Sequence, residues 1–500
     1  MKEFIKIHSE DNVVVALSNL SKGNQLIIED REIKLLNDIP QGHKIAIKEI
    51  RPKENVIKYG YPIGHAVKNI KEGEIVSKHN LASNLRDKLD YTNVRIMPKI
   101  KNSFLEKEKY FFNGFMRPDG QAGIRNEIWV IPTVGCVNSI AKQIAERLIS
   151  ETGGEGLDGI YYFSHSYGCS QLGDDLENTK KILRDMVYHP NAGGILVLGL
   201  GCENNQPNEF EKFCGNYDKS RVKFMICQEV EGNEIESGLN ILRQLYRNAI
   251  TNQKTRIPSN KLCIGLKCGG SDGFSGVTAN PLLGLFSDFV CCQLGGSVAL
   301  TEVPEMFGAE ILLMERSESV EIKNNIISLI NDFKDYFISH GESIDENPSP
   351  GNITGGITTL EEKSLGCIQK SGSTSIKAVL KYGDRIKTNG VNLISAPGND
   401  LVASTALAAA GCQLILFTTG RGTPLSTFVP TMKISTNSDL AKKKPGWIDF
   451  DAGPIADDRK PIEILDEFIE LVFSVINGRK VKSEKVGFHD LSIFKTGVTL

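Results

Sequence analysis

The sequence lacks an excess of either charge, a long apolar run and an even number of cysteines. Its 58 Lys and Arg residues nearly balance 61 Asp and Glu residues, leaving a net charge of −3, which argues against a nucleic-acid-binding protein and a disordered acidic chain. No apolar run approaches the roughly 20 residues of a membrane-spanning helix, and the N-terminal segment has no signal-peptide core. The 11 cysteines cannot all pair within one chain, which favours reduced thiols. We therefore expect a cytoplasmic protein without membrane or nucleic-acid partners.

Two nucleotide-binding motifs are also missing. The sequence has no GxxxxGK[ST] segment, so phosphoryl transfer on a P-loop is not expected. Residues 199–204, Gly-Leu-Gly-Cys-Glu-Asn, resemble a dinucleotide fingerprint, but Asn204 stands at the third glycine position. Cys202 and Glu203 would also crowd or repel a pyrophosphate. A nicotinamide cofactor is therefore disfavoured.

Residues 1–85 differ from the rest of the chain. Short runs rich in β-branched residues alternate with turn clusters such as Pro40–Gly42, a spacing typical of a small, mostly β domain. Four of the eight histidines fall in this part of the sequence, and surface solvation explains any one of them as well as function does. They are His8, His43, His65 and His79. Residues 86–110 are charged and irregular, and we interpret them as a linker.

The remaining residues alternate buried strand patterns with amphipathic helix patterns. Glu127–Pro132 is typical of a buried strand, and the apolar spacing that follows predicts a helix from Val137 to Ile149. A mostly polar segment, residues 248–260, indicates a border between two α/β blocks at residues 111–255 and 256–500. The predicted fold class is therefore multidomain α/β: a small N-terminal β domain followed by two α/β blocks with largely parallel sheets.

Four cysteines recur at a regular interval. Cys136, Cys169 and Cys202 are spaced by 33 residues and Cys268 follows after 66, whereas one strand with its returning helix takes roughly 30 residues. Because ligands of open α/β sheets bind at the carboxyl ends of the strands, we expect these cysteines at one edge, in the active site. We interpret the other seven as small apolar core residues: Cys214, Cys227, Cys263, Cys291, Cys292, Cys367 and Cys412.

Metal binding is the chemistry that these strand-end cysteines suggest. Thiolates bind soft or borderline metals, and Glu203 beside Cys202 adds an oxygen donor. Mixed sulfur and oxygen ligands favour a labile divalent iron or manganese over a closed structural zinc. His165, four residues before Cys169, is a candidate ligand or base. Because the spacing is not CxxC, the residues alone leave the metal site open.

Several long motifs resemble the altronate and galactarate dehydratase family, which also includes sulfolactate sulfo-lyase. The resemblance covers essentially the whole chain. Its motifs are Ile5–His8 with Asp11–Val13, Gly42–Lys44, Tyr59–Gly60 with Pro62–Gly64, Phe163–Asp175, Gly199–Asn205, Cys268–Asp272, Asn347–Gly351 and Thr418–Pro424. Residues 171–175 and 360–366 resemble the altronate branch more than the galactarate branch.

The resemblance implies an N-terminal SAF domain of the β-clip type over residues 1–85, joined to a dehydratase body. It also implies a hydro-lyase of hexuronate (galacturonate) catabolism that converts D-altronate to 2-dehydro-3-deoxy-D-gluconate, with Fe²⁺ or Mn²⁺ as cofactor. In such a reaction a metal stabilises the enediolate, a base takes the C2 proton and an acid protonates the departing C3 hydroxyl.

The residues and the resemblance together give the expected site. We expect the metal ligands among Cys169, Cys202, Cys268 and Glu203, and acid–base catalysis by His165, with His43 or His79 entering from the SAF domain. The expected substrate-binding residues are Arg125, Arg421, Ser271 and Asp272. The two arginines would clamp the substrate carboxylate, which suits a bidentate guanidinium.

Three alternatives stay open at this point. The substrate could be another sugar acid such as galactarate. The cysteines could hold an iron–sulfur cluster that serves electron transfer. The chain could also bind a sugar acid without turning it over. A homo-oligomer is a further expectation that the sequence leaves open.

Overall fold

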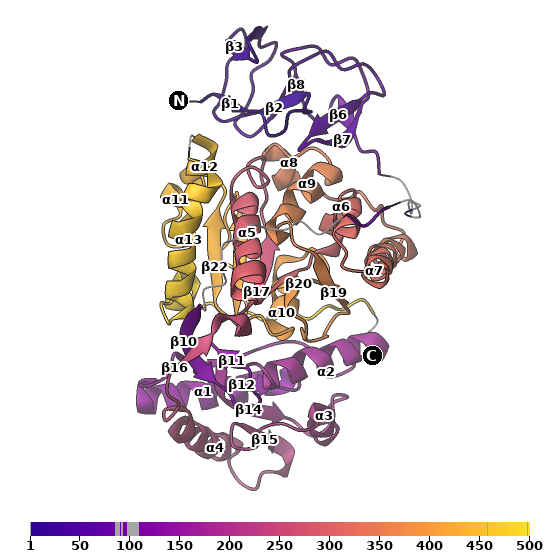
Figure 1. Cartoon of the computed structure of the whole chain (residues 1–500). Coiled ribbons are helices and arrows are strands. Elements are labelled where there is room, and N and C mark those ends of the chain that lie inside the picture. Colours follow the sequence, from indigo (N-terminus) through magenta and orange to yellow (C-terminus); the bar gives the residue numbers. More distant parts are fainter. Residues whose placement is uncertain (1, 86–90, 92–93, 98–109, 458, 498) are drawn as a thin grey trace.

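The computed structural model describes residues 2–85, 91, 94–97, 110–457, 459–497 and 499–500. The chain forms three bodies that follow one another along one axis, with the N-terminal β domain at one end, the second block in the middle and the first block at the other end (Figure 1). The predicted fold class is thereby confirmed. The predicted linker lies mostly outside the described residues. Of the helices that the structure describes, none combines the length and apolar character needed to cross a bilayer.

The N-terminal domain consists of short strands in small antiparallel sheets. Their orders are β1-β2-β5-β8, β3-β4 and β6-β7-β9. The strands are β1 Phe4–Ile5, β2 Val13–Ala16, β3 Gln25–Ile28, β4 Arg31–Lys34, β5 Lys44–Ala46, β6 Asn55–Lys58, β7 Tyr61–Ala66, β8 Ile75–Val76 and β9 Leu81–Ala82. Aliphatic residues such as Val14, Leu26 and Ile45 form its own small core, as β-branched strands with one buried face require.

The first block is a four-stranded parallel sheet between two layers of helices. Its strand order is β13-β12-β14-β15. The elements are β12 Glu127–Pro132, α1 Asn138–Thr152, β13 Gly159–Tyr162, α2 Gly173–Val187, β14 Ala192–Gly199, α3 Pro207–Cys214, β15 Val222–Ile226 and α4 Glu234–Ala249. Alternate residues of β12 face opposite layers: Ile128 packs against α1 and α4, whereas Trp129 packs against α2 and the second block. Both faces of the sheet are therefore buried, as parallel sheets require.

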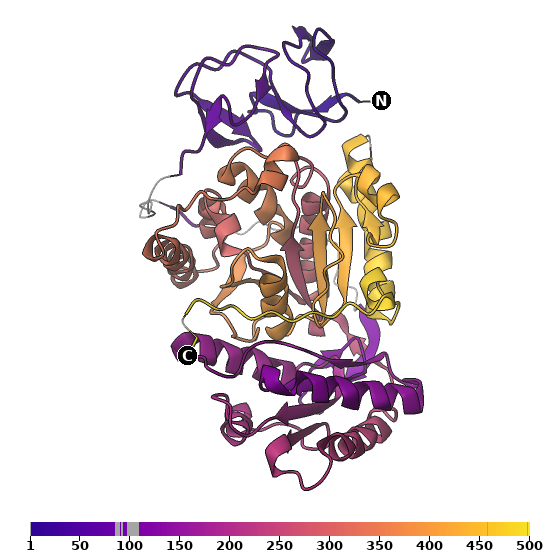
Figure 2. The ribbon, with the colours of Figure 1, turned by 180° about the vertical axis from the view of Figure 1, so that it is seen from behind.

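A small antiparallel sheet joins the two blocks. It has the order β11-β10-β16 and contains β10 Phe111–Met116, β11 Ala122–Gly123 and β16 Thr255–Pro258. The border predicted between residues 255 and 256 falls inside β16. The C-terminal segment runs back along the seam between the blocks (Figure 2), where Thr499 bridges to Gln171. The first and second blocks are thus joined at several points along the chain.

The second block is a seven-stranded parallel sheet with the order β19-β20-β18-β17-β21-β22-β23. Its strands are β17 Cys263–Cys268, β18 Ser297–Leu300, β19 Ile376–Leu380, β20 Gly390–Ile394, β21 Leu414–Thr419, β22 Thr431–Ser435 and β23 Phe450–Asp451. Its α-helices are α5 Ala279–Asp288, α6 Glu310–Glu315, α7 Val320–Ser339, α8 Pro350–Thr354, α9 Leu360–Cys367, α10 Asp400–Ala409, α11 Ser438–Lys443, α12 Pro454–Asp457, α13 Pro461–Ile476 and α14 Lys482–Lys485. The apolar helices α5 and α13 share the main core with the sheet.

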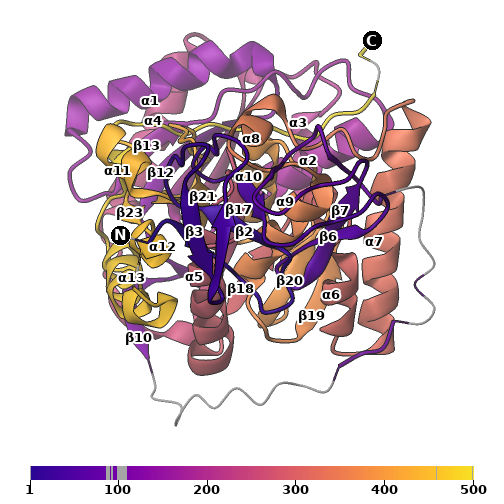
Figure 3. The ribbon, with the colours of Figure 1, turned by 90° about the horizontal axis from the view of Figure 1, so that it is seen from above.

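The central strand β17 runs from the first block toward the N-terminal domain. At its start, Cys263 N–H donates to Gln413, whose amide nitrogen lies 2.8 Å from the carbonyl oxygen of Ala122. Beyond its end, a Cβ on Gly273 would lie 2.1 Å from the carbonyl oxygen of Gly42 in the N-terminal domain. The N-terminal domain consequently lies over the carboxyl ends of the strands (Figure 3), where open α/β sheets bind ligands.

Candidate active site

Charged and thiol side chains gather at this covered carboxyl edge of the second block. They end or follow strands of the sheet, begin α10, or lie on α9 and the 3₁₀ turn after it: Lys267, Cys268, Glu302, Glu305, Lys363, Cys367, Lys370 and Asp400. All except Asp400 are buried. A buried ion costs several kcal/mol unless it is paired, and such groups concentrate at functional sites. We therefore take this edge as the candidate active site.

Glu302 lies at the centre of the cluster. Its Oε1 accepts a hydrogen bond from Lys267 Nζ. Its Oε2 lies 2.9 Å from Lys370 Nζ and accepts a hydrogen bond from the N–H of Cys268 at 3.2 Å. Its φ of +68° is a left-handed conformation that residues other than glycine rarely adopt. Burial alone would lower the pKa of Lys370, but the neighbouring anions outweigh burial and raise this pKa. The pKa of Lys267 is raised for the same reason. Both lysines therefore stay positively charged.

Glu305 belongs to the same cluster. Lys363 Nζ lies 2.9 Å from its Oε1, and Cys367 Sγ lies 3.4 Å from its Oε2. Burial opposes ionisation, but Lys363, with Lys267 and Lys370 behind it, outweighs burial and lowers the pKa of Glu305. Glu305 therefore stays a carboxylate.

Two buried thiols complete the cluster. Lys370 Nζ donates to Cys367 Sγ at 2.7 Å, and Cys268 Sγ lies 2.9 Å from Ser271 Oγ. A hydrogen bond between the two thiols outweighs burial and, with the charge of Lys370, lowers the pKa of Cys268 to about 6. The same bond raises the pKa of Cys367 well above its usual value. The thiol pair as a unit therefore carries one negative charge near neutral pH.

Glu302, Glu305 and Cys367 each offer a ligand atom to one point. These atoms lie within 4.8 Å of one another, and the described residues contain no other such group of His, Cys, Asp and Glu. Two carboxylate oxygens and one sulfur form a mixed donor set that suits divalent iron or manganese. Lys370 already contacts two of the three residues, so an ion bound here would compete with its ammonium group.

A buried ion triad holds the N-terminal domain over this edge. Lys44 and Lys58 of that domain each place Nζ 2.8 Å from one oxygen of Glu362 on α9. Burial opposes the charge on Glu362, but the two lysines outweigh it and lower its pKa to about 2. The same short helix carries Lys363 and Cys367. The contact that docks the domain therefore also fixes two groups of the site.

The two histidines expected from the N-terminal domain lie in different settings. His43 is half-buried at the interface, beside the close approach of Gly42 and Gly273, and its Nδ1 lies 3.3 Å from the carbonyl oxygen of Gln41. Burial lowers the pKa of its imidazole, so His43 is neutral at neutral pH. His79 is exposed, and the hydrogen bond described for it stays within its own loop. This position does not support the predicted catalytic role of His79.

The expected substrate-binding residues Ser271, Asp272 and Arg421 all lie at the candidate site. Ser271 is buried, and its carbonyl oxygen accepts from Asn352 Nδ2 at 2.8 Å. The carboxylate of Asp272 accepts from Thr436 Oγ1 at 2.9 Å, which anchors the loop after β17. Arg421 follows β21 and is exposed, so its guanidinium is open to a carboxylate at the mouth of the site.

Arg125 lies elsewhere, at the seam between the two blocks. It is fully buried, and its guanidinium forms a bidentate ion pair with Glu484 at 2.7 and 2.9 Å. The remaining donors bind the carbonyl oxygens of Ile124, Val475 and Arg479, so all five guanidinium N–H groups are used. This position does not support the predicted role of Arg125 in clamping the substrate, because its charge serves the packing of the C-terminal helices.

His165 lies in the first block rather than at the candidate site. Its Nε2 is 2.8 Å from the carbonyl oxygen of Pro132, and its Nδ1 accepts from the N–H of Tyr167 at 3.1 Å. Burial lowers its pKa. Both ring nitrogens are occupied by backbone groups, so this position does not support the predicted role of His165 as catalytic acid or base.

The predicted metal ligands do not come together. Cys169 and Cys202 follow strands of the first block, whereas Cys268 ends β17, about 17 Å along the strand from the end that touches the first block. The carboxylate of Glu203 is buried and accepts from the N–H groups of Leu200 and Gly201. Glu203 therefore shapes its own loop, and the structure does not bring all four expected ligands to one ion.

Sequence reasoning missed most of the charged cluster. Cys367 is buried, as expected of a core residue, but its sulfur lies among charged groups, so the interpretation as a purely apolar residue is wrong. One signal was available in the sequence. Lys267 lies inside an otherwise apolar strand, where a lysine is rarely found unless it is paired.

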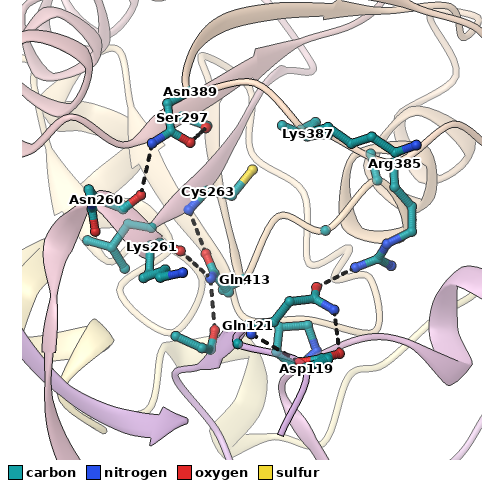
Figure 4. Close-up of a pocket in the computed structure, with 17 residues that line it drawn as sticks. Asp119, Gln121, Asn260, Lys261, Cys263, Ser297, Arg385, Lys387, Asn389 and Gln413 are labelled. Atoms are coloured by element: carbon teal, nitrogen blue, oxygen red, sulfur yellow. Dashed lines mark hydrogen bonds between the residues drawn. The ribbon is translucent and has the colours of Figure 1, made fainter. Parts of the chain in front are cut away.

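A separate polar pocket of about 320 Å³ lies at the seam between the blocks (Figure 4). Asp119, Gln121, Lys261 and Arg385 line it, and the guanidinium of Arg385 donates to Gln121 at 2.6 Å. The pocket adjoins Cys263, at the amino end of β17 and opposite the charged cluster. Because ligands of parallel sheets bind at the carboxyl ends of strands, we do not assign the reaction to it.

Three family models match consecutive parts of the chain. Residues 2–84 match the altronate/galactarate dehydratase SAF domain, residues 114–250 the second domain of D-galactarate dehydratase/altronate hydrolase, and residues 259–499 the C-terminal part of D-galactarate/altronate dehydratase. These three parts correspond to the three bodies of the fold.

Full-length relatives agree with the family models. Altronate dehydratase of Bacillus subtilis (strain 168) is 52% identical over 502 residues, and that of Escherichia coli (strain K12) is 51% identical over 501 residues, each alignment covering 100% of both chains. Galactarate dehydratase (L-threo-forming) of Escherichia coli (strain K12) is 30% identical over 509 residues, or 98% of this chain and 96% of the relative. The chain therefore belongs to the altronate/galactarate dehydratase family.

Proposed function

We propose that the chain is a hydro-lyase that dehydrates D-altronate to 2-dehydro-3-deoxy-D-gluconate. The observation that carries this proposal is the full-length identity of 52% and 51% to two altronate dehydratases, against 30% to a galactarate dehydratase. The reaction removes the C2 proton and the C3 hydroxyl as one water molecule, and the resulting enol becomes the 2-keto acid. The buried cluster beneath the SAF domain is the place that we assign to this chemistry.

Electrostatics explains why a cluster of lysines suits this reaction. Removing the C2 proton adds negative charge beside a carboxylate that is already negative. Lys267, Lys363 and Lys370 supply fixed positive charge in a water-poor site, where such charge acts far more strongly than in bulk water. Arg421 at the mouth suits the substrate carboxylate through its planar guanidinium. The three ammonium groups thus stabilise the charge that develops in the transition state.

We assign the proton transfers to the same cluster. Cys268 Sγ would accept the proton from C2 and return it to the departing C3 hydroxyl, while Lys370 Nζ, which reaches both Glu302 and Cys367, stays charged and stabilises the departing oxygen. A positioned acid and base of this kind typically contribute 10²- to 10⁴-fold each, as an order of magnitude. Burial beneath the SAF domain keeps bulk water from competing for these protons.

We also propose Fe²⁺ or Mn²⁺ as cofactor, held by Glu302, Glu305 and Cys367, whose thiol would release its proton to solvent on binding the ion. Two observations support this assignment: the donor atoms lie within 4.8 Å of one another, and they combine oxygen with sulfur. When bound, the ion would supply Lewis-acid stabilisation of the enediolate. The surrounding lysines limit the affinity, because the ion must displace the hydrogen bond of Lys370 to Glu302.

The cell compartment and pathway follow from the same proposal. The odd number of cysteines, 11, favours reduced thiols and hence a reducing compartment such as the cytoplasm. Dehydration of an aldonate to a 3-deoxy-2-keto acid would place the enzyme in hexuronate (galacturonate) catabolism.

The test is 2-keto acid formation from D-altronate by anaerobically purified protein supplied with Fe²⁺ or Mn²⁺. Galactarate and other aldonates serve as the substrate panel. We expect altronate to be preferred at least about tenfold, which corresponds to about 1.4 kcal/mol in transition-state binding. Preference for galactarate, or no keto acid from any substrate, would contradict the proposal.

Metal ligation is tested by calorimetry on two variants. Glu305→Gln should weaken binding of Mn²⁺ at least tenfold, because it removes a donor charge. The matched control is Glu310→Gln, which alters a buried carboxylate paired with Lys334 outside the cluster. Equal affinities in both variants would exclude Glu305 as a ligand.

A further inference from the structure

Three exposed cysteines lie together at the carboxyl edge of the first block, away from the candidate active site. Cysteine is among the most buried residue types, and eight of the 11 cysteines here are buried or half-buried. Cys136, Cys169 and Cys202 alone are exposed. Their exposure means that they do not serve as core packing residues, and the proposed dehydration chemistry does not use them.

The three cysteines lie in the loops that follow neighbouring strands. Each follows a glycine, and they come four, seven and three residues after the ends of β12, β13 and β14 respectively. Because β12 lies between β13 and β14 in the sheet, and adjacent strands are about 4.8 Å apart, the three loops are next to one another. One edge of one sheet therefore presents three thiols to solvent.

Hydrogen bonds tie the three loops into one structure. The N–H of Gly135 donates to the carbonyl oxygen of Tyr167 at 3.0 Å, and the N–H of Asn205 donates to that of Gly168 at 2.9 Å. Gly168 has φ +97°, and a Cβ there would lie 2.0 Å from the carbonyl oxygen of Thr133, so only glycine allows this approach. The positions of the cysteines relative to one another are thus fixed before any ligand binds.

The helices after these loops add positive potential. α1, α2 and α3 begin two, four and five residues after the respective cysteines, and none of their N-cap residues makes a side-chain capping bond. In contrast, α4, α7 and α10 of the same chain have side-chain caps. Uncapped helix N-termini favour anions through their backbone N–H groups. They also favour the thiolate form of a nearby cysteine.

Single-ion sites fit this edge poorly. Among the described residues the three thiols do not form a group within 4.8 Å, the spacing found for Glu302, Glu305 and Cys367. A tetrahedral zinc would need a fourth donor, and the adjacent carboxylate of Glu203 is already committed to backbone N–H groups. A cubane cluster holds its thiolates on separate iron atoms, so it suits three thiols that are fixed but spread apart.

We propose that Cys136, Cys169 and Cys202 hold a [4Fe–4S] cluster. Each thiol loses its proton as its sulfur binds one iron, so three irons gain a protein ligand and the fourth stays open to an oxygen ligand from solvent or a small molecule. The remaining strand-end cysteine of this sheet, Cys227, is half-buried and packs against the core, so it is not a ligand. The site is independent of the buried cluster proposed for dehydration.

The experiment is anaerobic reconstitution of the full-length reduced protein with equal amounts of Fe²⁺ and Fe³⁺ and with sulfide. After desalting, iron, acid-labile sulfide and the visible spectrum are measured. We expect about four irons and four sulfides per chain, with a visible absorption that dithionite bleaches. Cys136→Ser, Cys169→Ser and Cys202→Ser should each lower the sulfide content severalfold. Cys227→Ser and Cys214→Ser are matched controls that should load like the wild type, and thermal unfolding confirms that all variants fold.

Other results would overturn the proposal. These are iron uptake without sulfide, preferential zinc uptake, no uptake at all, or equal loading of folded wild type and the three variants. Altronate dehydration is measured on the same samples, before and after loading. Because the cluster is read from sulfide and spectrum, and the dehydration from keto acid, either proposal can fail without the other.

Discussion

The two parallel sheets place functional side chains at the same topological position but in opposite environments. At the carboxyl edge of the second block, Lys267 and Glu302 are fully buried beneath the SAF domain. At the corresponding edge of the first block, Cys169 and Cys202 face solvent. Strand ends supply the side chains in both cases. Only the second block is covered by the SAF domain, so interactions between charges are strengthened by burial there and screened by water at the first block.

The largest expected effect comes from removing one ammonium group from the edge that the SAF domain covers. Lys370→Met breaks a buried ion pair and leaves Glu302 with Lys267 as its remaining partner, and loss of one partner of a buried ion pair typically costs about 3–5 kcal/mol. Loss of the transition-state charge should also lower kcat for altronate by roughly 100- to 1,000-fold. Chemical denaturation and steady-state kinetics measure the two effects.

Lys334→Met is the control for that variant. Lys334 pairs with Glu310 at 3.3 Å and is equally buried, but it lies outside the cluster. It should lose comparable stability while kcat stays close to the wild-type value. If both variants lose kcat equally, the lysines of the cluster have only a structural role.

The next effect concerns the cover itself. Glu362→Gln removes the charge that Lys44 and Lys58 share, and it should destabilise the protein by about 3 kcal/mol or more because two buried ammonium groups lose their partner. The exposed pair of Lys6 with Glu29 provides the comparison, since Glu29→Gln should change the free energy of unfolding by less than about 1 kcal/mol. Urea denaturation at neutral pH measures both.

Acid should weaken the same contact in the wild type. The pKa of Glu362 falls from its ordinary 4.5 to about 2 in the folded protein. Its ionisation therefore stabilises the fold fully at pH values above 4.5, and this stabilisation is lost as the pH falls from 4.5 toward 2. The full contribution is about 3 kcal/mol, at about 1.4 kcal/mol per pKa unit. Between pH 5 and pH 3, stability should therefore fall more steeply in the wild type than in Glu362→Gln. Identical slopes would show that this carboxyl does not govern the acid response.

The smallest expected effect on the protein comes from thiol modification, which compares the solvent accessibility of the cysteines at the two sheet edges. Brief treatment of the reduced, metal-free protein with iodoacetamide should modify Cys136, Cys169 and Cys202 first, with little loss of stability. Cys268 and Cys367 should react only after unfolding, because they are buried. Peptide mass mapping over time gives the order. Early modification of Cys268 would show that the SAF domain does not cover the second edge in solution.

Much of the fold could be predicted because its signals are local. Strand and helix patterns identified the buried strand Glu127–Pro132 and a helix after Cys136, which correspond to β12 and α1. The interval of 33 residues correctly indicated that Cys136, Cys169 and Cys202 end neighbouring parallel strands, since each strand–helix unit has a similar length. The further step of 66 residues to Cys268 was misleading, because the chain enters a different sheet in between.

The sequence by itself determined the order of the three domains, the family motifs and the strand-end positions of the glycine–cysteine pairs, all of which depend on residues close together in the chain. Only the tertiary structure decided which of these residues meet. Lys44 pairs with Glu362, which lies 318 residues later in the sequence. Arg125 pairs with Glu484, which lies 359 residues later. Such partners are set by how buried surfaces pack, because a charge removed from water must be paired wherever the fold brings a partner within reach. For this reason the lysine–carboxylate cluster became visible only in three dimensions.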